Sequence, residues 1–130
     1  MNGGIYIAVF HLPGPKLIRV GSLGRLELLA GIYWYVGSAQ RNLSSRIDRH
    51  ARKSKPLRWH IDYLSVHADM IGAIVMKGDK DRKCIIATEL AKLLTQIPGF
   101  GASDCRCSSH LFYSHNLPQI LPKIYLKVTA

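Results

Sequence analysis

The fold is decided by the segment Gly31-Ile32-Tyr33-Trp34-Tyr35-Val36-Gly37-Ser38-Ala39-Gln40-Arg41-Asn42-Leu43-Ser44-Ser45-Arg46-Ile47-Asp48-Arg49-His50, which predicts a strand, a turn and a helix in succession. Residues 32–36 are β-branched or aromatic, as strand residues usually are, and Gly37-Ser38 ends the run. Asn42 is a favourable N-cap for a helix. The helix that follows carries Leu43, Ile47 and Ala51 on one narrow apolar stripe, so most of its surface is expected to face water.

The water-facing side of this predicted helix is crowded with cationic side chains. Arg46, Arg49, His50 and Lys53 follow one another at steps of three and four residues, the spacing at which helical side chains are neighbours. Like charges at that spacing repel each other by a few tenths of a kcal/mol per pair. An anionic partner opposite this face would offset the repulsion.

The chain as a whole is strongly basic. Among 130 residues, 18 Lys and Arg stand against 8 Asp and Glu, which gives a formal net charge of +10 and favours a polyanionic partner. A purely solubilising face is the alternative, but such surfaces usually mix both signs. Membrane binding is disfavoured, because the helix lacks the broad apolar face that would enter lipid. Seven of the cations lie between residues 41 and 58: Arg41, Arg46, Arg49, Arg52, Lys53, Lys55 and Arg58.

Length and composition predict one domain over residues 1–130, because no Gly/Ser-rich or Pro-rich linker divides the chain. The start, Met1-Asn2-Gly3-Gly4, lacks the features of a signal peptide, and no apolar run approaches the roughly 20 residues that span a bilayer. We therefore expect a soluble, cytoplasmic protein with no membrane partner. Three cysteines, two of them separated by one residue, form a poor disulfide framework and fit a reducing compartment.

The rest of the chain predicts an α+β fold in which helices flank a small antiparallel sheet. Residues 4–12 form a strand that is apolar on both faces, which favours a central place in the sheet. An extra N-terminal hairpin follows over 17–20 and 25–28, and we expect it to run into the 32–36 strand as an antiparallel meander.

Further elements are expected beyond residue 50. They are a helix from Pro56 through Leu64, a strand over 70–76, a helix over 81–96, a long loop over 98–109, and strands over 111–113 and 124–128. The 81–96 helix is expected to turn Ile85, Ile86, Leu90, Leu93 and Leu94 toward the core.

Several short motifs occur in a fixed order. Tyr35-Val36-Gly37 is followed by Asn42, by Arg46 nine residues after the glycine, and by His50 four residues later. Gly4-Ile5-Tyr6 lies on the first strand, and Glu89 lies on the third predicted helix. This arrangement resembles the signature of the GIY-YIG nuclease superfamily.

Longer segments make the chain most similar to the small stand-alone Uri-type branch of that superfamily, over roughly residues 4–113. The segments are Tyr35-Val36-Gly37-Ser38-Ala39, Trp59-His60-Ile61-Asp62-Tyr63-Leu64 and Pro98-Gly99-Phe100-Gly101-Ala102-Ser103-Asp104-Cys105-Arg106-Cys107.

The chain departs from the usual sequence pattern of the superfamily between its two tyrosine motifs and at a late asparagine. The inserted hairpin places Tyr6 and Tyr35 29 residues apart, whereas a short turn usually separates the two motifs. A second Gly-Ile-Tyr ends at Tyr33, but Tyr33 shares a strand with Tyr35 and cannot supply the second of two adjacent strands. Asn116 is the late asparagine available to match the one that many members carry.

The resemblance implies metal-dependent endonuclease activity on phosphodiester bonds, most often in DNA, which leaves a 5′ phosphate and a 3′ hydroxyl. It assigns Tyr6 to the attacking water as general base, Tyr35 to a supporting position, and Glu89 to one Mg²⁺ or Mn²⁺ ion. Arg46 suits the phosphate, because a guanidinium is a planar, permanently charged fork. His50 would relay the proton or bind the phosphate, and packing in the core is its alternative role.

Cations around the expected site are assigned to the nucleic acid. On the 56–64 helix, His60 and Asp62 face either the substrate or water, whereas Trp59 and Tyr63 are expected to pack. The expected partner is DNA, with RNA and branched DNA as alternatives, and a protein partner for targeting is left open. The binding set is Arg41, Arg49, Arg52, Lys53, Lys55, Arg58, His60 and Arg106.

Two other interpretations stay open. A non-catalytic nucleic-acid-binding module would use the same basic face, with Glu89 as a structural residue. A zinc or redox site would use Cys105, Cys107 and His110, with Cys84 as a fourth ligand, but a one-residue spacing is unlike the common zinc knuckles. Arg106, between two of these cysteines, would lower a thiol pKa, yet no Cys-His-Asn order accompanies it.

Overall fold

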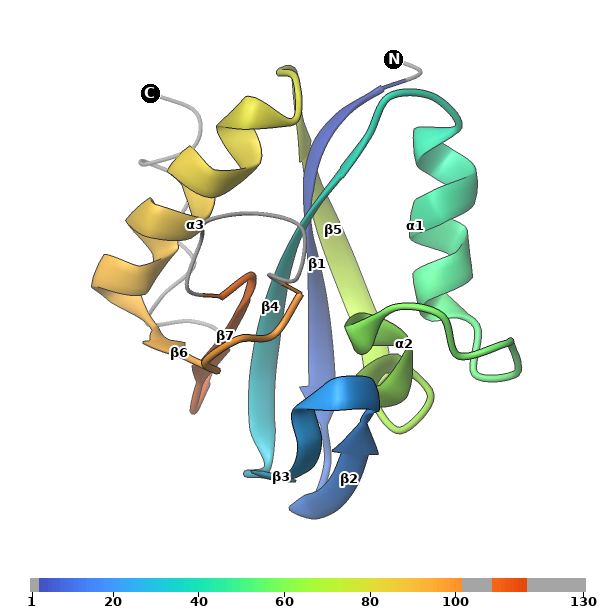
Figure 1. The fold of residues 1–130 in the computed structure, drawn as a ribbon, viewed down its shortest axis with the longest axis vertical. Helices are drawn as coiled ribbons and strands as arrows, with labels where there is room; N and C mark the ends of the chain where they lie inside the picture. Colours follow the sequence, from blue (N-terminus) through green and yellow to red (C-terminus); the bar gives the residue numbers. More distant parts are fainter. Residues whose placement is uncertain (1–2, 102–108, 117–130) are drawn as a thin grey trace.

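The computed structural model describes residues 3–101 and 109–116. Their centre is a five-stranded sheet in the order β5-β1-β4-β7-β6, in which every neighbouring pair is antiparallel (Figure 1). The predicted α+β class and the internal position of the first strand are therefore confirmed. The strands are β1 (Gly4–Leu12), β4 (Gly31–Ala39), β5 (Asp69–Met76), β6 (Thr95–Gln96) and β7 (Leu111–Ser114).

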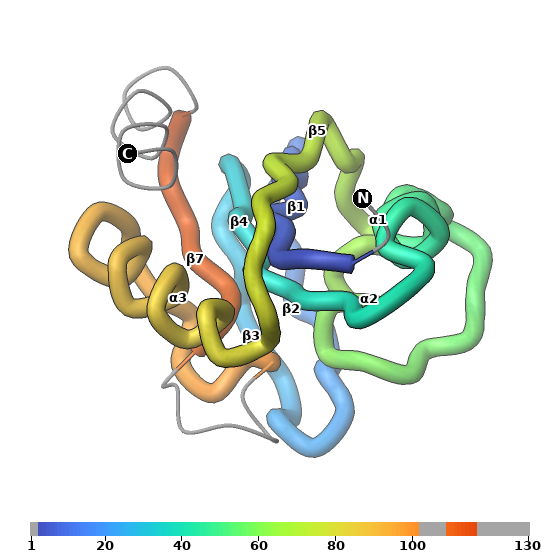
Figure 2. Tube along the Cα trace, turned by 90° about the horizontal axis from the view of Figure 1, so that it is seen from above, coloured from blue at the N-terminus to red at the C-terminus, as the bar shows by residue number. Residues whose placement is uncertain are grey.

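Strand β1 buries both of its faces, as its composition predicts. Ile5, Ile7 and Val9 belong to the core under helix α3 (Asp81–Leu93). Tyr6, Ala8 and Phe10 belong to a second core, under helices α1 (Leu43–Ala51) and α2 (His60–Ser65). Figure 2 shows the sheet edge-on between α3 and the α1–α2 pair.

The inserted hairpin forms, but the expected meander is wrong. Strands β2 (Lys16–Val20) and β3 (Gly24–Leu28), joined by the short 3₁₀ helix η1 (Gly21–Leu23), make a separate two-stranded sheet. Strand β1 skips this hairpin and pairs with β4. The hairpin buries Ile18, Val20 and Leu28 in the α2 core, which gives it a packing reason to fold away from the main sheet.

Helix α1 begins where Asn42 predicts it, although Asn42 itself adopts a left-handed conformation (φ 58°) that asparagine tolerates better than most residues. Its buried residues are Leu43 and His50, whereas Ala51 is exposed. The expected Leu43–Ile47–Ala51 stripe is therefore wrong at its last position, and His50 belongs to the inward face.

Helices α2 and α3 differ from the expectation at their ends. Helix α2 begins at His60 and not at Pro56, and Leu57 before it remains 46% exposed. Helix α3 ends at Leu93 because Thr95 and Gln96 pair with β7. Ile85 was expected in the core but is 60% exposed.

Strand β7 confirms the strand predicted over 111–113. The strand predicted over 124–128, and residues 102–108 of the predicted long loop, lie outside the described residues. No described helix combines the length and the apolar composition needed to cross a membrane.

Candidate functional site

The two tyrosine motifs meet because β1 and β4 pair directly. Their register places Tyr6 opposite Gly37. A Cβ atom at residue 37 would collide with the ring and hydroxyl of Tyr6, so the phenol lies across the β4 backbone at a place where only glycine leaves room. The insertion between the motifs therefore leaves their pairing intact.

Helix α1 adds His50 and Arg46 to this pair of strands. The Tyr6 hydroxyl lies 2.6 Å from His50 Nε2, in a buried contact. The ring of His50 also meets the ring of Tyr35 edge-on, at 5.7 Å between centroids. The Arg46 guanidinium donates through Nη1 to the Ser38 carbonyl oxygen at 2.7 Å, which fixes it at the end of β4.

Burial sets the protonation of the Tyr6–His50 pair. Burial, assisted by the nearby Lys55 ammonium, lowers the pKa of His50 to about 4, so the imidazole is neutral near pH 7. Burial and the neighbouring Tyr35 raise the pKa of Tyr6 far above its usual value. Both groups are therefore neutral, and the phenol donates to Nε2 in the tautomer of His50 that carries its proton on Nδ1. His50 Nδ1 is buried, and no hydrogen-bond partner for it occurs among the described residues.

These residues line a pocket of about 330 Å³ at the end of β4. Besides Tyr6, Tyr35, Arg46 and His50, its wall includes residues around the start of α2 and two lysines at the start of α3. The described lining residues include four permanent cations and no carboxylate, which suits an anionic group. The cations are Arg46, Arg58, Lys80 and Lys83.

Trp59 connects the two arginines of α1. Its ring centroid lies 5.0 Å from the Arg46 guanidinium carbon and 4.6 Å from that of Arg49, and its ring also meets that of His50 at 6.2 Å. Such cation–π contacts restrict where an arginine can point. Trp59 therefore helps to hold Arg46 in the pocket wall.

A buried carboxylate holds α1 and α2 together beside the pocket. Asp62 is fully buried and accepts two hydrogen bonds from Arg49, at 2.7 and 3.0 Å, and one each from the backbone N–H groups of Arg58 and Trp59. Burial alone would raise the pKa of Asp62, but these hydrogen bonds outweigh it and hold the pKa below its usual value. Asp62 therefore faces neither substrate nor water, contrary to both expectations.

Two residues of the expected binding set have internal partners. Arg49 is occupied by Asp62 and by the Pro56 carbonyl oxygen. Lys55, whose side chain is 1% exposed, donates to the carbonyl oxygens of Arg49 and His50 at the end of α1. Their interactions position the helices, so neither side chain presents a free cation to a ligand.

The rest of the binding set divides into three groups. Arg58 and His60 line the pocket, and His60 Nδ1 accepts a hydrogen bond from the Gly101 N–H at 2.9 Å. Arg41 and Arg52 are exposed outside it, as is Lys53, which pairs with Asp69 at 2.6 Å. Arg106 lies outside the described residues.

Glu89, the expected metal ligand, is not among the described lining residues of the pocket. It lies on α3, with its Oε1 atom 3.3 Å from Lys92 Nζ. The described residues contain no group of three His, Cys, Asp or Glu side chains that could hold a metal ion. The described residues of this pocket therefore do not fit Mg²⁺ or Mn²⁺.

The expected zinc site falls mostly outside the described residues, because Cys105 and Cys107 are not described. His110 is buried, with Nε2 3.9 Å from Cys84 Sγ. Cys84 is disulfide-bonded, so the expectation of reduced cysteines is wrong for this residue. A sulfur in a disulfide is not available as the thiolate ligand that zinc needs.

Sequence reasoning missed three residues of the pocket wall. Trp59 was expected only to pack, yet it is 37% exposed at the pocket. Lys80 and Lys83 were not singled out. Their three-residue spacing at a predicted helix start was visible, but only the packing of α3 beside the end of β4 turns them into site residues.

The neutral state of His50 predicts a loss of stability in mild acid. Between pH 6.5 and about 4 the unfolded chain binds a proton at His50 that the folded chain refuses, so the free energy of unfolding falls as the pH falls through this window. The expected loss is on the order of 3 kcal/mol, and it is absent above pH 6.5. Urea unfolding at about pH 7.0 and about pH 4.5 should show this loss as a lower free energy of unfolding at the lower pH.

A His50→Gln variant is the control for this effect. It should lose less stability than the wild type between the two pH values, because glutamine does not titrate. Equal losses in both proteins would show that His50 is not the group responsible.

One comparison with known proteins identifies the family of this chain. The chain matches no curated protein and no solved structure. The model of the family described as "Domain of unknown function DUF123" matches residues 5–129, which include both core faces and every residue of the pocket. The chain therefore belongs to the family of proteins that carry domain of unknown function DUF123.

Proposed function

We propose that this protein is an endonuclease that hydrolyses nucleic-acid phosphodiester bonds, most often in DNA. The observation that carries the proposal is the contact between Tyr6 Oη and His50 Nε2, inside a cationic pocket that Arg46 also lines. A phenol bonded to a neutral imidazole can pass on a proton, and the neighbouring guanidinium can stabilise charge on a phosphate. The resemblance to GIY-YIG nucleases supports the same assignment of roles.

In the proposed reaction Arg46 binds the scissile phosphate, because its guanidinium lines the pocket, where its bond to the Ser38 carbonyl oxygen holds it in place. A water next to Tyr6 loses a proton to the phenol oxygen while the phenol proton moves to His50 Nε2. The water oxygen then bonds to phosphorus, and the bond from phosphorus to the 3′ oxygen breaks. The 3′ oxygen takes up a proton from solvent water and His50 later returns its extra proton to solvent, which leaves a 3′ hydroxyl and a 5′ phosphate.

This order of events explains why His50 is kept neutral. A histidine already protonated at Nε2 could not accept the Tyr6 proton, and burial prevents that state near pH 7. Tyr35, whose ring lies against His50, fits the supporting position that the resemblance gives it. Mg²⁺ or Mn²⁺, with Glu89 as its ligand, remains part of the proposal on the resemblance alone.

A non-catalytic nucleic-acid-binding module is the second candidate. It is favoured by the absence of a carboxylate among the described lining residues, because a cationic pocket alone is sufficient for phosphate binding. The two candidates differ in what Arg46 must do. A binder needs its charge, whereas an enzyme needs the placement of two N–H groups on the reacting phosphate.

An Arg46→Lys variant tests this difference. We expect the single-turnover cleavage rate to fall by about 10- to 100-fold while the dissociation constant changes by less than about threefold, since the charge is kept and the fork is lost. The substrates are labelled linear, flapped, junction and single-stranded DNA, with Mg²⁺, with Mn²⁺ and with chelator.

The control is Arg82→Lys, the same exchange at an exposed position of α3 that does not line the pocket, and its cleavage rate should stay unchanged. An Arg46→Lys protein that cuts as fast as the wild type would remove Arg46 from the reaction. A wild-type protein that binds every substrate and cuts none would favour the binding module.

A further inference from the structure

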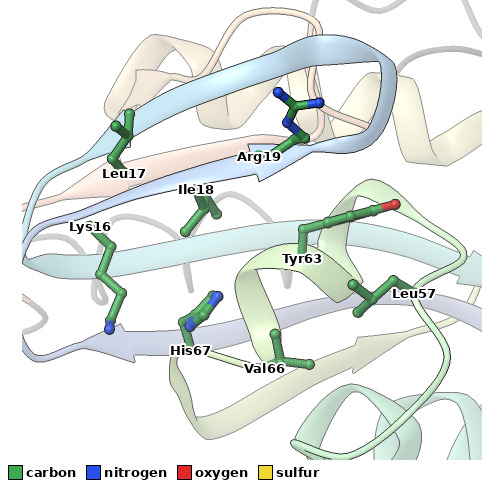
Figure 3. A pocket seen from close by; sticks show the side chains of 8 residues that line it. All are labelled: Lys16, Leu17, Ile18, Arg19, Leu57, Tyr63, Val66 and His67. Atoms are coloured by element: carbon green, nitrogen blue, oxygen red, sulfur yellow. The ribbon is translucent and has the colours of Figure 1, made fainter.

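A groove runs between the inserted hairpin and α2, on the same side of the sheet as the candidate pocket. Figure 3 shows Lys16 to Arg19 of β2 on one side, and Leu57 with Tyr63, Val66 and His67 on the other. Its volume is about 520 Å³. The groove combines apolar side chains with cations, and its described lining contains no carboxylate. Leu17 and Leu57 are 60% and 46% exposed, so part of its apolar surface is open to solvent.

The hairpin beside this groove carries an unfavourable pair of charges. In the β2–β3 register Arg19 lies directly opposite Arg25, and both residues are exposed. Like charges directly opposite each other destabilise an antiparallel pair. Glu27, opposite Leu17, is the acid of this face, yet no salt bridge from it to either arginine occurs among the described residues. An anion bound along β2 would offset the repulsion.

The groove and the candidate pocket are separate, but neighbouring residues at the start of α2 line them. Leu57 in the groove directly precedes Arg58 and Trp59, which line the pocket. Tyr63 in the groove lies one helical turn after His60 in the pocket. A strand bound beside His60 in the pocket would therefore lie one helical turn from Tyr63 in the groove.

We propose that this groove and the Arg19–Arg25 face bind an unpaired nucleic-acid strand that flanks the scissile phosphate, so that the substrate carries a single-stranded extension. This inference rests on the proposed function. Cations meet the phosphates of the strand, and Tyr63 with the exposed leucines offers the apolar surface on which unpaired bases pack. A duplex hides the faces of its bases and would leave that apolar surface unused.

The experiment compares a blunt duplex with the same duplex carrying a 5′ or a 3′ single-stranded extension. Binding is measured by fluorescence anisotropy in chelator over a range of salt concentrations, so that no cleavage is needed. We expect one of the two extensions to raise the affinity of the wild type by about tenfold. The double variant Arg19→Ser/Arg25→Ser should lose that gain and flatten the slope of log K against log salt by about 1.4.

The control is Lys77→Ser/Arg82→Ser, which removes two exposed cations near the β5–α3 turn, at the end of the molecule opposite the hairpin (Figure 1). It should keep the tenfold gain. An Arg19→Ser/Arg25→Ser protein that still prefers the extension, or a wild type indifferent to it, would overturn this inference and leave the proposed nuclease standing. A wild type that binds none of the nucleic acids would overturn both.

Discussion

Replacing Tyr6 by Phe is expected to lower the single-turnover cleavage rate about a thousand-fold, while the affinity for the substrate changes little. The hydroxyl lies 2.6 Å from His50 Nε2, and removing it leaves the attacking water without its route to a proton acceptor. A positioned acid–base group usually contributes about 10²- to 10⁴-fold. The cleavage rate and the dissociation constant of the same purified protein measure the two quantities separately.

Tyr33→Phe is the matched control for this variant. Tyr33 is also a buried tyrosine, on the neighbouring strand β4, and its hydroxyl donates to the Leu29 carbonyl oxygen at 2.7 Å, outside the pocket. Each variant loses one hydroxyl and one hydrogen bond, which costs about 1 kcal/mol of stability. Tyr33→Phe should cut at the wild-type rate. If Tyr6→Phe also cuts at that rate, the phenol has no part in the reaction.

The largest effect on stability is expected for Asp62→Ala, which should lower the free energy of unfolding by about 3–5 kcal/mol. Its carboxylate accepts hydrogen bonds from Arg49 and from two backbone N–H groups before α2, and Lys55 lies within 3.9 Å. Without it, the partly buried Arg49 and the start of α2 lose their acceptor. Denaturant unfolding measures the loss.

Asp69→Ala is the control for this variant, because it also removes an aspartate from an ion pair with a cation of the 49–55 region. The Lys53–Asp69 pair is more than half exposed, so its loss should leave the unfolding midpoint unchanged. Asp62→Asn keeps the shape of the side chain and should fall between wild type and Asp62→Ala. Equal stability of the two alanine variants would contradict the role given to Asp62.

Local sequence patterns predicted the described strands other than β6, and the place where α1 begins. The alternating apolar residues of 4–12 specify a strand buried on both faces, and β1 is that strand. The run from Ile32 to Val36 likewise lies inside β4. Alternating apolar residues and β-branched runs extend over only a few neighbouring residues, so they can be recognised in the sequence alone.

Features that depend on distant partners could not be predicted in this way. The spacing of His50 places it on the polar face of the predicted helix. In the structure it is buried, because its ring is hydrogen-bonded to Tyr6, 44 residues earlier in the chain. The hairpin 17–28 has the sequence of a meander, and only the direct pairing of β1 with β4 excludes it from the sheet. Asp62 was assigned to substrate or water because its partner Arg49 lies on another helix.

The candidate site also contains some residues that the sequence identifies and others that only the packing of distant segments brings in. Tyr6, Tyr35, Arg46 and His50 were identified through the motifs that carry the resemblance to GIY-YIG nucleases, and the structure brings them to one pocket. Lys80 and Lys83 carry no motif of their own and enter the wall through the packing of α3. Their positive charge adds to that of Arg46 at the place proposed for the phosphate.

The proposed nuclease function requires that the wild-type protein breaks phosphodiester bonds. The decisive measurement is end-group analysis of the products after incubation with labelled linear, flapped, junction and single-stranded DNA, with Mg²⁺ or Mn²⁺ and with chelator. We expect products with a 5′ phosphate and a 3′ hydroxyl when a divalent ion is present. Intact DNA in every reaction, from a protein that binds it, would contradict the proposed nuclease function.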